Sequence, residues 1–188
     1  DNCKFTLLSH HTVQLYAADS KKKFYNDNIS GKVINDALSN PNFLISFTNF
    51  LNASLSQGTF PDYCKISTVT PIQKVKGSLN SSDLRPINTL CVISQIVERI
   101  VKDQLLEHFE SNNLFCKEQS GFRKFHSCET SLTYVLTDWK ESIDKNHVIV
   151  AVFLDFKRAF ETVDRTLLLQ KLSLYGCDET VISWFRSY

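Results

Sequence analysis

A run of seven apolar residues, Val148–Leu154 (VIVAVFL), constrains the fold of this chain more than any other feature of its sequence. The run is rich in β-branched residues and has no polar position, so a strand made from it would be apolar on both faces. It is too short for a buried helix, which takes about 10 to 12 residues. The pattern therefore predicts a central strand of a sheet that is covered on both sides.

The rest of the chain predicts helices and one hairpin around this strand. In residues 65–76, apolar and β-branched residues alternate with others and a polar loop follows, which is typical of a hairpin. Helices are predicted wherever apolar residues recur at spacings of three and four. Together these elements predict an α+β fold. The predicted helices cover residues 41–57, 91–110, 127–143, 165–175 and 178–188.

Several of these helices carry a recognisable start or end. Pro41 suits the first turn of the first helix, and Gly58 ends its apolar pattern. Ser127, Asp164 and Asp178 each precede an amphipathic segment and have side chains that can cap a helix N-terminus. These signals fix the predicted helix ends more closely than the apolar spacing alone.

The charge of the chain is nearly balanced, with 21 Lys and Arg against 20 Asp and Glu. This balance gives no global attraction to nucleic acid, so binding would need a local basic cluster. Residues 64–90 supply such an excess in the predicted hairpin, although an ordinary solvated basic loop would look the same. On the solvent-exposed face of the helix at 91–110, Glu98 and Lys102 are predicted to form an i,i+4 ion pair. The charged residues of 64–90 are Lys65, Lys74, Lys76, Arg85 and the single Asp83.

Two further features of composition bear on the class of protein. The six cysteines include no CxxC pair, which predicts reduced thiols and no cysteine metal site. No uncharged apolar run approaches about 18 residues, so no transmembrane helix and no membrane partner are predicted. The sequence contains no Met, which predicts that it is an excised piece of a longer protein.

Asp155 directly follows the predicted central strand, where sheets commonly bind ligands and metals. An aspartate in this position can also cap a helix or hold a turn, so position alone leaves both roles open. The segment DFKRAF places this carboxylate close to the bulky Phe160. A site that joins a nucleotide to a growing chain needs carboxylates to bind two Mg²⁺ ions and a bulky side chain that contacts the sugar of the nucleotide.

Three segments in order resemble the fingers and first palm motifs of reverse transcriptases, most closely those of non-LTR (LINE) retrotransposons of the jockey-like group. They are PIQKVKGSLNSSDLRPINTLCVISQIVERIV, EQSGFRKFHSCETSL and VFLDFKRAFETVDRTLLLQKLSLYG, and the resemblance covers roughly residues 58–188. It implies a partial right-hand polymerase. Residues 1–57 would form a helical N-terminal segment or linker, 58–130 the fingers, and 131–188 the first part of a truncated palm.

The resemblance also implies roles for residues of the palm. Asp155 matches the first metal-binding aspartate, and the backbone carbonyl of Phe156 would help to bind the second ion. The ion would be Mg²⁺, with Mn²⁺ as the alternative. Phe160 matches the aromatic gate that excludes a ribose 2′-hydroxyl.

In the fingers, the resemblance implies that Lys74 and Arg85 reach the triphosphate of the incoming nucleotide. Because the loop between them is longer than in retroviral relatives, Lys76 is an alternative to Lys74. Arg123 belongs to the GFR motif, which would lie near the template and the nucleotide.

The sequence departs from the family pattern in several places. Glu161 stands where relatives usually have Asp, and Phe125 and Cys128 stand where relatives often have a small residue and Thr. The family also continues into a glycine-containing motif and a hairpin with two adjacent aspartates, and neither occurs in these 188 residues. Since one aspartate cannot hold two dications, the chain alone is predicted not to polymerise nucleotides. The strand 148–154 would lack its family partner, which predicts an unpaired apolar edge and self-association.

The resemblance thus implies part of an RNA-directed DNA polymerase of a retrotransposon, which transfers a deoxynucleoside monophosphate from a dNTP to a primer 3′-hydroxyl. Its partners would be an RNA template, a DNA primer, the dNTP, and the remaining palm and thumb. Its location would be intracellular, in the nucleus or the cytoplasm. The alternatives are a non-catalytic RNA-binding remnant of a retroelement and an α+β domain with no role in nucleic-acid binding.

Overall fold

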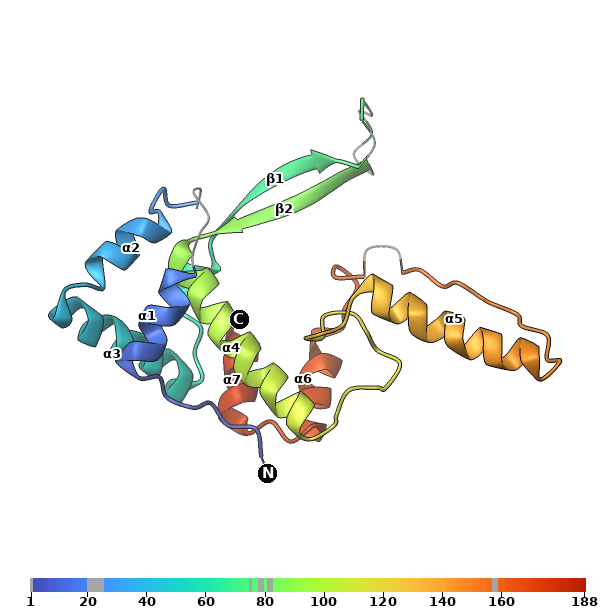
Figure 1. The fold of residues 1–188 in the computed structure, drawn as a ribbon. Coiled ribbons are helices and arrows are strands. Elements are labelled where there is room, and N and C mark those ends of the chain that lie inside the picture. Colours follow the sequence, from blue (N-terminus) through green and yellow to red (C-terminus); the bar gives the residue numbers. More distant parts are fainter. Residues whose placement is uncertain (1, 20–25, 75, 78–79, 81–82, 157–158) are drawn as a thin grey trace. The chain divides into compact units, whose positions relative to one another are not determined.

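The computed structural model of the chain describes residues 2–19, 26–74, 76–77, 80, 83–156 and 159–188. Helices and a two-stranded antiparallel sheet occur together, which confirms the α+β class (Figure 1). No helix among the described residues is long and apolar enough to cross a membrane. The elements are α1 (His10–Ala18), α2 (Gly31–Ala37), α3 (Pro41–Gln57), the 3₁₀-helix η1 (Asp62–Lys65), β1 (Ser67–Gln73), β2 (Leu84–Leu90), α4 (Val92–Ser111), α5 (Cys128–Asp144), α6 (Arg165–Leu174) and α7 (Glu179–Ser187).

The chain divides into two compact units. Unit 1 comprises Asp1–His108 together with Arg165–Tyr188, and unit 2 comprises Phe109–Asp164. The two units are defined by the contacts within each of them, and their boundaries differ from the predicted ones after residues 57 and 130. The predicted domain boundaries therefore stay predictions. Within unit 1, however, the N-terminal segment shares a core with α4 and α7.

The helix α3 illustrates how local signals set up this core. The Asn40 side chain caps its start by accepting hydrogen bonds from the N–H groups of Asn42 (2.9 Å) and Phe43 (3.3 Å). Gly58 ends it with a φ of 60°, as predicted. A Cβ at Gly58 would lie 2.6 Å from the carbonyl oxygen of Thr180 in α7, so the two helices approach closely only because this residue has no side chain.

The helix α7 supplies the largest side chain of the core. Asp178 caps it by accepting from the Val181 N–H (2.9 Å), which confirms the predicted start. Trp184 is fully buried, and its indole Nε1 donates to Ser54 Oγ of α3 at 3.1 Å. Since Trp184 also packs edge-on against Phe60 with ring centroids 5.2 Å apart, it joins α7 to α3 and to the segment that follows α3.

The hairpin of β1 and β2 extends away from the helices of unit 1 (Figure 1). Its antiparallel register pairs Ser67 with Leu90 at the base and Gln73 with Leu84 at the far end. A backbone hydrogen bond from the Lys74 N–H to the Asp83 carbonyl (2.7 Å) continues the pairing by one position. The hairpin is therefore as predicted, and most of its side chains are exposed.

Unit 2 has a well-capped helix but no buried residue among those that the structure describes. Ser127 and Thr130 form a reciprocal capping box at the start of α5, as the N-cap prediction required. The apolar face predicted for α5 is nevertheless largely exposed, with Leu132, Leu136 and Ile143 at 59%, 42% and 60% exposure.

The predicted central strand at 148–154 is wrong for this structure, in which the segment forms no strand. A strand needs a neighbour to accept and donate its ladder hydrogen bonds, and none of the described residues pairs with this segment. Its side chains are correspondingly open to solvent. Five of them are 76–91% exposed: Val148, Val150, Val152, Phe153 and Leu154.

Candidate nucleic-acid interface

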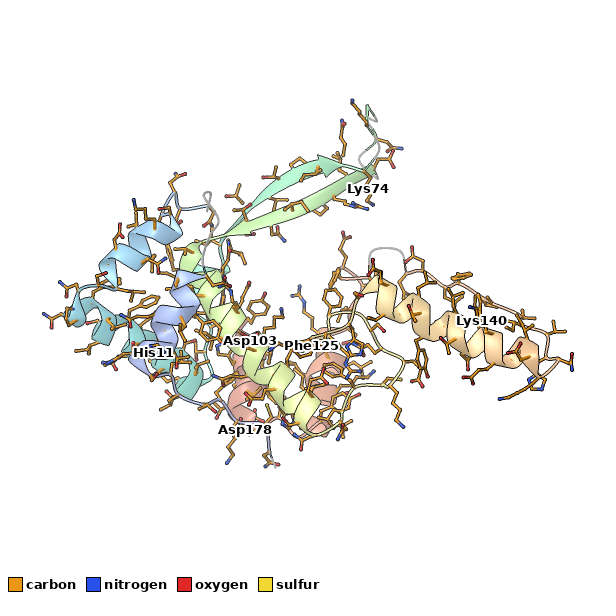
Figure 2. All side chains as sticks on the ribbon, viewed as in Figure 1. His11, Lys74, Asp103, Phe125, Lys140 and Asp178 are labelled. Atoms are coloured by element: carbon orange, nitrogen blue, oxygen red, sulfur yellow. The ribbon has the colours of Figure 1, made fainter. Side chains whose placement is uncertain are left out.

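The hairpin brings the two predicted fingers cations to one face. The register places Arg85 opposite Ile72, and Lys74 opposite Asp83. Because side chains alternate between the faces of a strand, Lys74, Arg85 and Ile72 lie on the same face, with the two cations in a diagonal relation. Diagonal neighbours are about 7 to 8 Å apart, a separation that adjacent phosphates of one ligand can bridge. Figure 2 shows Lys74 near the far end of the hairpin.

This face carries two cations, one carboxylate and apolar residues, since Asp83 lies on it opposite Lys74. Lys74, Arg85 and Ile87 are all exposed, and Ile87 shares the face of Arg85 two positions along β2. Lys76 is also exposed, but several residues of the loop that follows it lie outside the described part of the chain. Which of Lys74 and Lys76 reaches a phosphate of the nucleotide therefore stays open.

Arg123 lies in unit 2, where its guanidinium is engaged by protein groups. Nε donates to Glu110 Oε1 (3.1 Å) and Nη2 to Glu110 Oε2 (2.8 Å), a bidentate pair. Nη1 donates to the carbonyls of Cys116 (3.4 Å) and Gln119 (3.3 Å). The guanidinium carbon also lies 5.0 Å from the ring centroid of Phe115.

These contacts make Arg123 the anchor of the loop that precedes α5. Its side chain is only 15% exposed. The hydrogen bond with Arg123 holds the pKa of Glu110 below its ordinary value, and the same bond raises the pKa of Arg123. The role of Arg123 near template and nucleotide stays a prediction, since the structure shows its donors bonded to Glu110 of α4 and to two loop carbonyls.

The residues predicted for the palm lie in unit 2, directly after the exposed apolar segment. Asp155 is exposed and lies outside any helix or strand, directly after the apolar run. Phe156 is 83% and Phe160 87% exposed, so neither forms a wall around the Asp155 carboxylate. Lys157 and Arg158, between them, lie outside the described residues.

The described residues do not by themselves fit a two-ion metal centre. No three of their His, Cys, Asp or Glu side chains gather as a candidate metal site. Two dications need several oxygen ligands to offset their mutual repulsion, and Asp155 offers one carboxylate. Asp155 can contribute a ligand to such a centre but cannot complete one.

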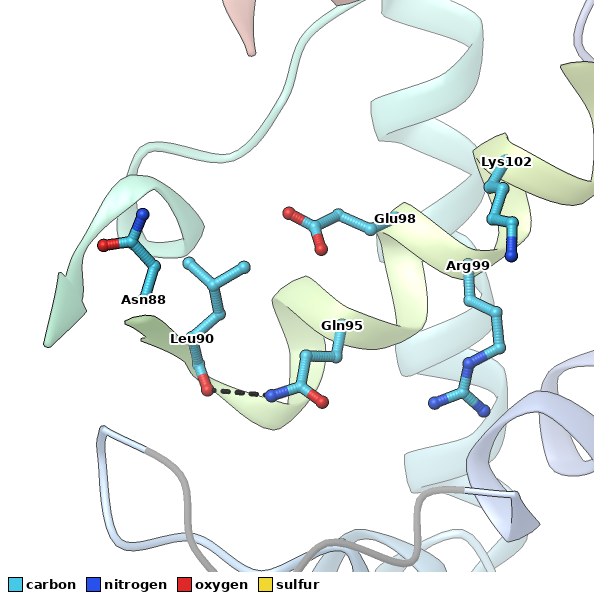
Figure 3. A pocket seen from close by; sticks show the side chains of 6 residues that line it. All are labelled: Asn88, Leu90, Gln95, Glu98, Arg99 and Lys102. Atoms are coloured by element: carbon cyan, nitrogen blue, oxygen red, sulfur yellow. Dashed lines mark hydrogen bonds between the residues drawn. The ribbon is translucent and has the colours of Figure 1, made fainter. Parts of the chain in front are cut away.

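A groove in unit 1, which sequence reasoning missed, lies between the end of β2 and one face of α4 (Figure 3). Its volume is about 380 Å³. The signal for it was the spacing of four polar residues of α4 at i, i+3, i+4 and i+7, which places them on one helix face. The lining residues are Asn88, Leu90, Gln95, Glu98, Arg99 and Lys102.

The predicted ion pair of Glu98 with Lys102 is wrong, because Glu98 has a different partner. Its Oε1 accepts a hydrogen bond from the hydroxyl of Tyr188 at 2.8 Å. Burial and this bond to the Glu98 carboxylate raise the pKa of Tyr188 to about 12, so the hydroxyl stays protonated and donates. Burial also raises the pKa of Glu98 above its ordinary 4.5, although the bond from Tyr188 opposes this.

The raised pKa predicts how stability depends on pH. An acid whose pKa is higher in the folded state than in the unfolded state binds protons more readily when folded. Its contribution to stability is fully present below about pH 4.5 and is lost as the pH rises through the folded pKa. Glu98→Gln, which keeps an oxygen acceptor for Tyr188, is therefore expected to stabilise unit 1 at pH 7 relative to the parent chain.

Urea denaturation at pH 4 and pH 7 tests this expectation. The gain of Glu98→Gln over the parent chain should be larger at pH 7 than at pH 4. Glu129→Gln, an exposed position in the first turn of α5, is the control and should show no such increase. An equal gain at both pH values would contradict the effect of burial on Glu98.

Comparisons with known proteins show which family the chain belongs to. The family model "Reverse transcriptase (RNA-dependent DNA polymerase)" matches residues 72–188, a range that contains every predicted site residue. "Probable RNA-directed DNA polymerase from transposon BS" of Drosophila melanogaster is 27% identical over 122 residues, which is 64% of this chain and 14% of that protein. "Probable RNA-directed DNA polymerase from transposon X-element", of the same organism, is 26% identical over 121 residues, 64% of this chain and 13% of that protein. The chain thus spans about one seventh of the length of these curated relatives.

Proposed function

The chain belongs to the reverse transcriptase family, and from this premise we propose that it forms the fingers and the first part of the palm of a retrotransposon RNA-directed DNA polymerase. In this reaction the primer 3′-hydroxyl oxygen bonds to the α-phosphorus of a dNTP, and pyrophosphate leaves. An RNA template directs the choice of nucleotide. An intracellular location, nuclear or cytoplasmic, is part of the same proposal.

The observation that carries the proposal is the shared hairpin face of Lys74 and Arg85, inside the matched range. Two cations in a diagonal relation suit a triphosphate, which carries several negative charges along a short chain. Arg can bind phosphate oxygens with two parallel hydrogen bonds, while Lys acts as a point charge. Since both side chains are exposed and lie at the far end of the hairpin, a ligand can reach them.

For the palm, we propose that Asp155 and the Phe156 carbonyl supply ligands for Mg²⁺, or for Mn²⁺, and that Phe160 borders the nucleotide sugar. The ions would polarise the reacting phosphate when bound. Because these residues offer one carboxylate, the remaining ligands would come from further palm residues of the parent polymerase. The 188-residue chain is therefore proposed to bind its substrates without extending a primer by itself.

The test of the hairpin measures binding of an RNA template annealed to a DNA primer, by fluorescence anisotropy over a range of salt. Arg85→Glu should weaken binding several-fold and make the slope of log K against log salt shallower by about 1. Lys32→Glu, an exposed position in α2, is the control for the same change of charge. Equal behaviour of the two variants would overturn the assignment of the hairpin.

A second measurement separates a nucleotide site from RNA binding alone. Mg²⁺ and a dNTP should protect Lys74 from an amine-reactive label while Lys32 stays reactive, as read by mass spectrometry. Equal labelling of both residues would overturn the nucleotide site and favour the non-catalytic RNA-binding remnant. Primer extension by the parent chain that is lost in Asp155→Asn would contradict the proposed need for further carboxylates.

A further inference from the structure

Two cysteines of unit 1 meet where its two chain segments come together. Unit 1 is built from Asp1–His108 and Arg165–Tyr188, and Cys3 belongs to the first of these segments while Cys177 belongs to the second. Both residues carry free thiols in the structure and are 6% exposed. Neither has a part in the nucleotide site proposed above, so their meeting needs a separate explanation.

The backbone holds the two cysteines in register. Cys3 and Cys177 form a parallel β-bridge, in which the Cys3 N–H donates to the Gly176 carbonyl (2.8 Å) and the Asp178 N–H donates to the Cys3 carbonyl (3.0 Å). Paired backbones lie about 4.8 Å apart. This separation is within the range of about 4.4 to 6.8 Å that the Cα atoms of a disulfide span.

The side chains of the bridge also face each other. A hydrogen bond joins the thiols of Cys3 and Cys177, which places the two sulfur atoms in contact. Burial raises the pKa of Cys3 above its ordinary 9.0 and raises the pKa of Cys177 to about 12, so both thiols are protonated at pH 7. Because the thiolate is the reactive form, they react slowly at this pH.

Both sides of the bridge are anchored in the fold. Three residues after Cys3, the Thr6 N–H donates to Gln104 Oε1 of α4 at 2.8 Å. Directly after Cys177, the Asp178 side chain caps the start of α7. A covalent bond between the two cysteines would therefore form within the existing arrangement of the backbone.

We propose that Cys3 and Cys177 form a disulfide when the protein meets a small-molecule disulfide such as oxidised glutathione, and that this bond joins the two chain segments of unit 1 covalently. In the reduced chain, the polypeptide connects these segments through unit 2. The disulfide adds a direct connection, which ties α6 and α7 to the segment that carries the hairpin. It stabilises unit 1 in a redox-dependent way and does not depend on the proposed function.

The bond forms by two successive thiol–disulfide exchanges. The thiolate of one cysteine attacks a sulfur of the small disulfide, which releases one small thiolate and leaves a mixed disulfide. The thiolate of the other cysteine then attacks the protein sulfur of this mixed disulfide, and the second small thiolate leaves. The two thiol protons of the protein end on the two released thiolates. The protein thus loses two electrons, and the small disulfide gains them.

A second pair of buried thiols provides an internal comparison. Cys64 and Cys91 also share a thiol hydrogen bond. The described strand pairing, however, ends at Ser67 and Leu90, so it does not fix the separation of these two backbones. The disulfide between Cys3 and Cys177 is therefore expected to form in preference to one in this second pair.

The test uses the full chain with the exposed Cys116 and Cys128 replaced by Ser, which leaves the four buried thiols. The folded protein is equilibrated with oxidised glutathione at about pH 8.5, where more of each thiol is ionised. The remaining thiols are alkylated, and tryptic peptides are identified by mass spectrometry. We expect a disulfide that links peptide 1–4 to peptide 172–186, which contain Cys3 and Cys177, and dithiothreitol should remove it.

Urea denaturation of the same samples measures the effect on stability. Oxidation should raise the urea midpoint by about 1 M, because a bond that closes a long loop constrains the unfolded chain. Cys177→Ser should show no such shift on oxidation, whereas Cys64→Ser should keep it. Each variant is compared with itself, oxidised against reduced, so a loss of stability caused by the substitution does not enter the comparison.

Three outcomes would overturn the inference. A link between Cys64 and Cys91 in place of the expected one would show that the bridge does not direct the oxidation. A link between Cys3 and Cys177 that forms only in urea would show that the unfolded chain, and not the fold, brings the thiols together. An oxidised chain whose urea midpoint is not raised would show that the bond does not stabilise unit 1. None of these measurements involves nucleic acid, so their failure leaves the proposed function unaffected.

Discussion

Trp184→Ala is expected to lower the free energy of unfolding of unit 1 by about 3 to 5 kcal/mol. The side chain is 1% exposed and lies in the core cluster. It packs edge-on against Phe60 and Phe5, with centroid distances of 5.2 and 6.0 Å, and stacks on Tyr188 at 5.5 Å. Alanine would leave a cavity among these rings. Since domains are typically stable by about 5 to 15 kcal/mol, this loss should remove much of the stability of unit 1.

Urea denaturation followed by circular dichroism measures this effect. Ser54→Ala is the matched control, because it removes the partner of the indole N–H and leaves the ring in place. It should cost about 1 to 3 kcal/mol, the range for leaving a buried donor unsatisfied. A loss below about 1 kcal/mol for Trp184→Ala would be far under the range for a buried tryptophan and would contradict the described core.

The position of Trp184 also bears on the N-terminal segment. Residues 1–57 lie outside the matched range, yet Leu51 and Leu55 of α3 are buried in the same core cluster as Trp184. Gly58, at the end of α3, also lies very close to Thr180 of α7, so α3 and α7 pack tightly against each other. This segment is thus a structural part of unit 1 and not merely a connection to it.

Elements with local signals were predicted well from the sequence. The C-terminal end of α3 followed from Gly58, and the starts of α5 and α7 followed from the capping side chains of Ser127 and Asp178, because capping depends on residues within one turn of the helix end. The hairpin followed from its alternation and its polar loop. From that register, the shared face of Lys74 and Arg85 follows by geometry alone.

Contacts between distant residues could not be predicted in this way. Glu98 was expected to pair with Lys102, one turn away, but its partner Tyr188 lies 90 residues along the chain. The anchoring of Arg123 by Glu110 likewise depends on how the intervening loop folds back. Spacing within a helix shows which residues can meet, and tertiary packing decides which of them do.

The apolar segment at 148–154 failed as a strand for a related reason. Its residue types favour a strand, but strand formation depends on a partner that supplies the ladder hydrogen bonds. The described residues of unit 2 provide no such partner and no apolar layer to cover the segment. The residue types of a segment show that it favours a strand. They do not show whether a partner strand is present.

The exposed segment is expected to make the chain self-associate. Val148, Val150 and Val152 are 91%, 83% and 76% exposed, and alternate positions of an extended segment point to the same side. Each such side chain left in water forgoes about 1.5 to 3 kcal/mol of burial energy. The backbone of the segment also has no strand partner among the described residues, so its N–H and C=O groups can pair with a second copy. Sedimentation velocity should therefore show a weight-average mass that rises with protein concentration.

Threonine at all three valines keeps the β-branched shape and makes this side of the segment polar, so the triple variant should sediment as a monomer of 21.6 kDa at concentrations where the parent chain associates. Leu15→Thr is the control, because Leu15 is an exposed apolar residue of α1 in unit 1 and should leave the association unchanged. A monomeric parent chain with a sharp, concentration-independent melt would contradict the prediction. Association that persists in the triple variant would assign it to another surface. The expected result would mean that the exposed apolar segment at 148–154 finds its missing strand partner in a second copy of the chain.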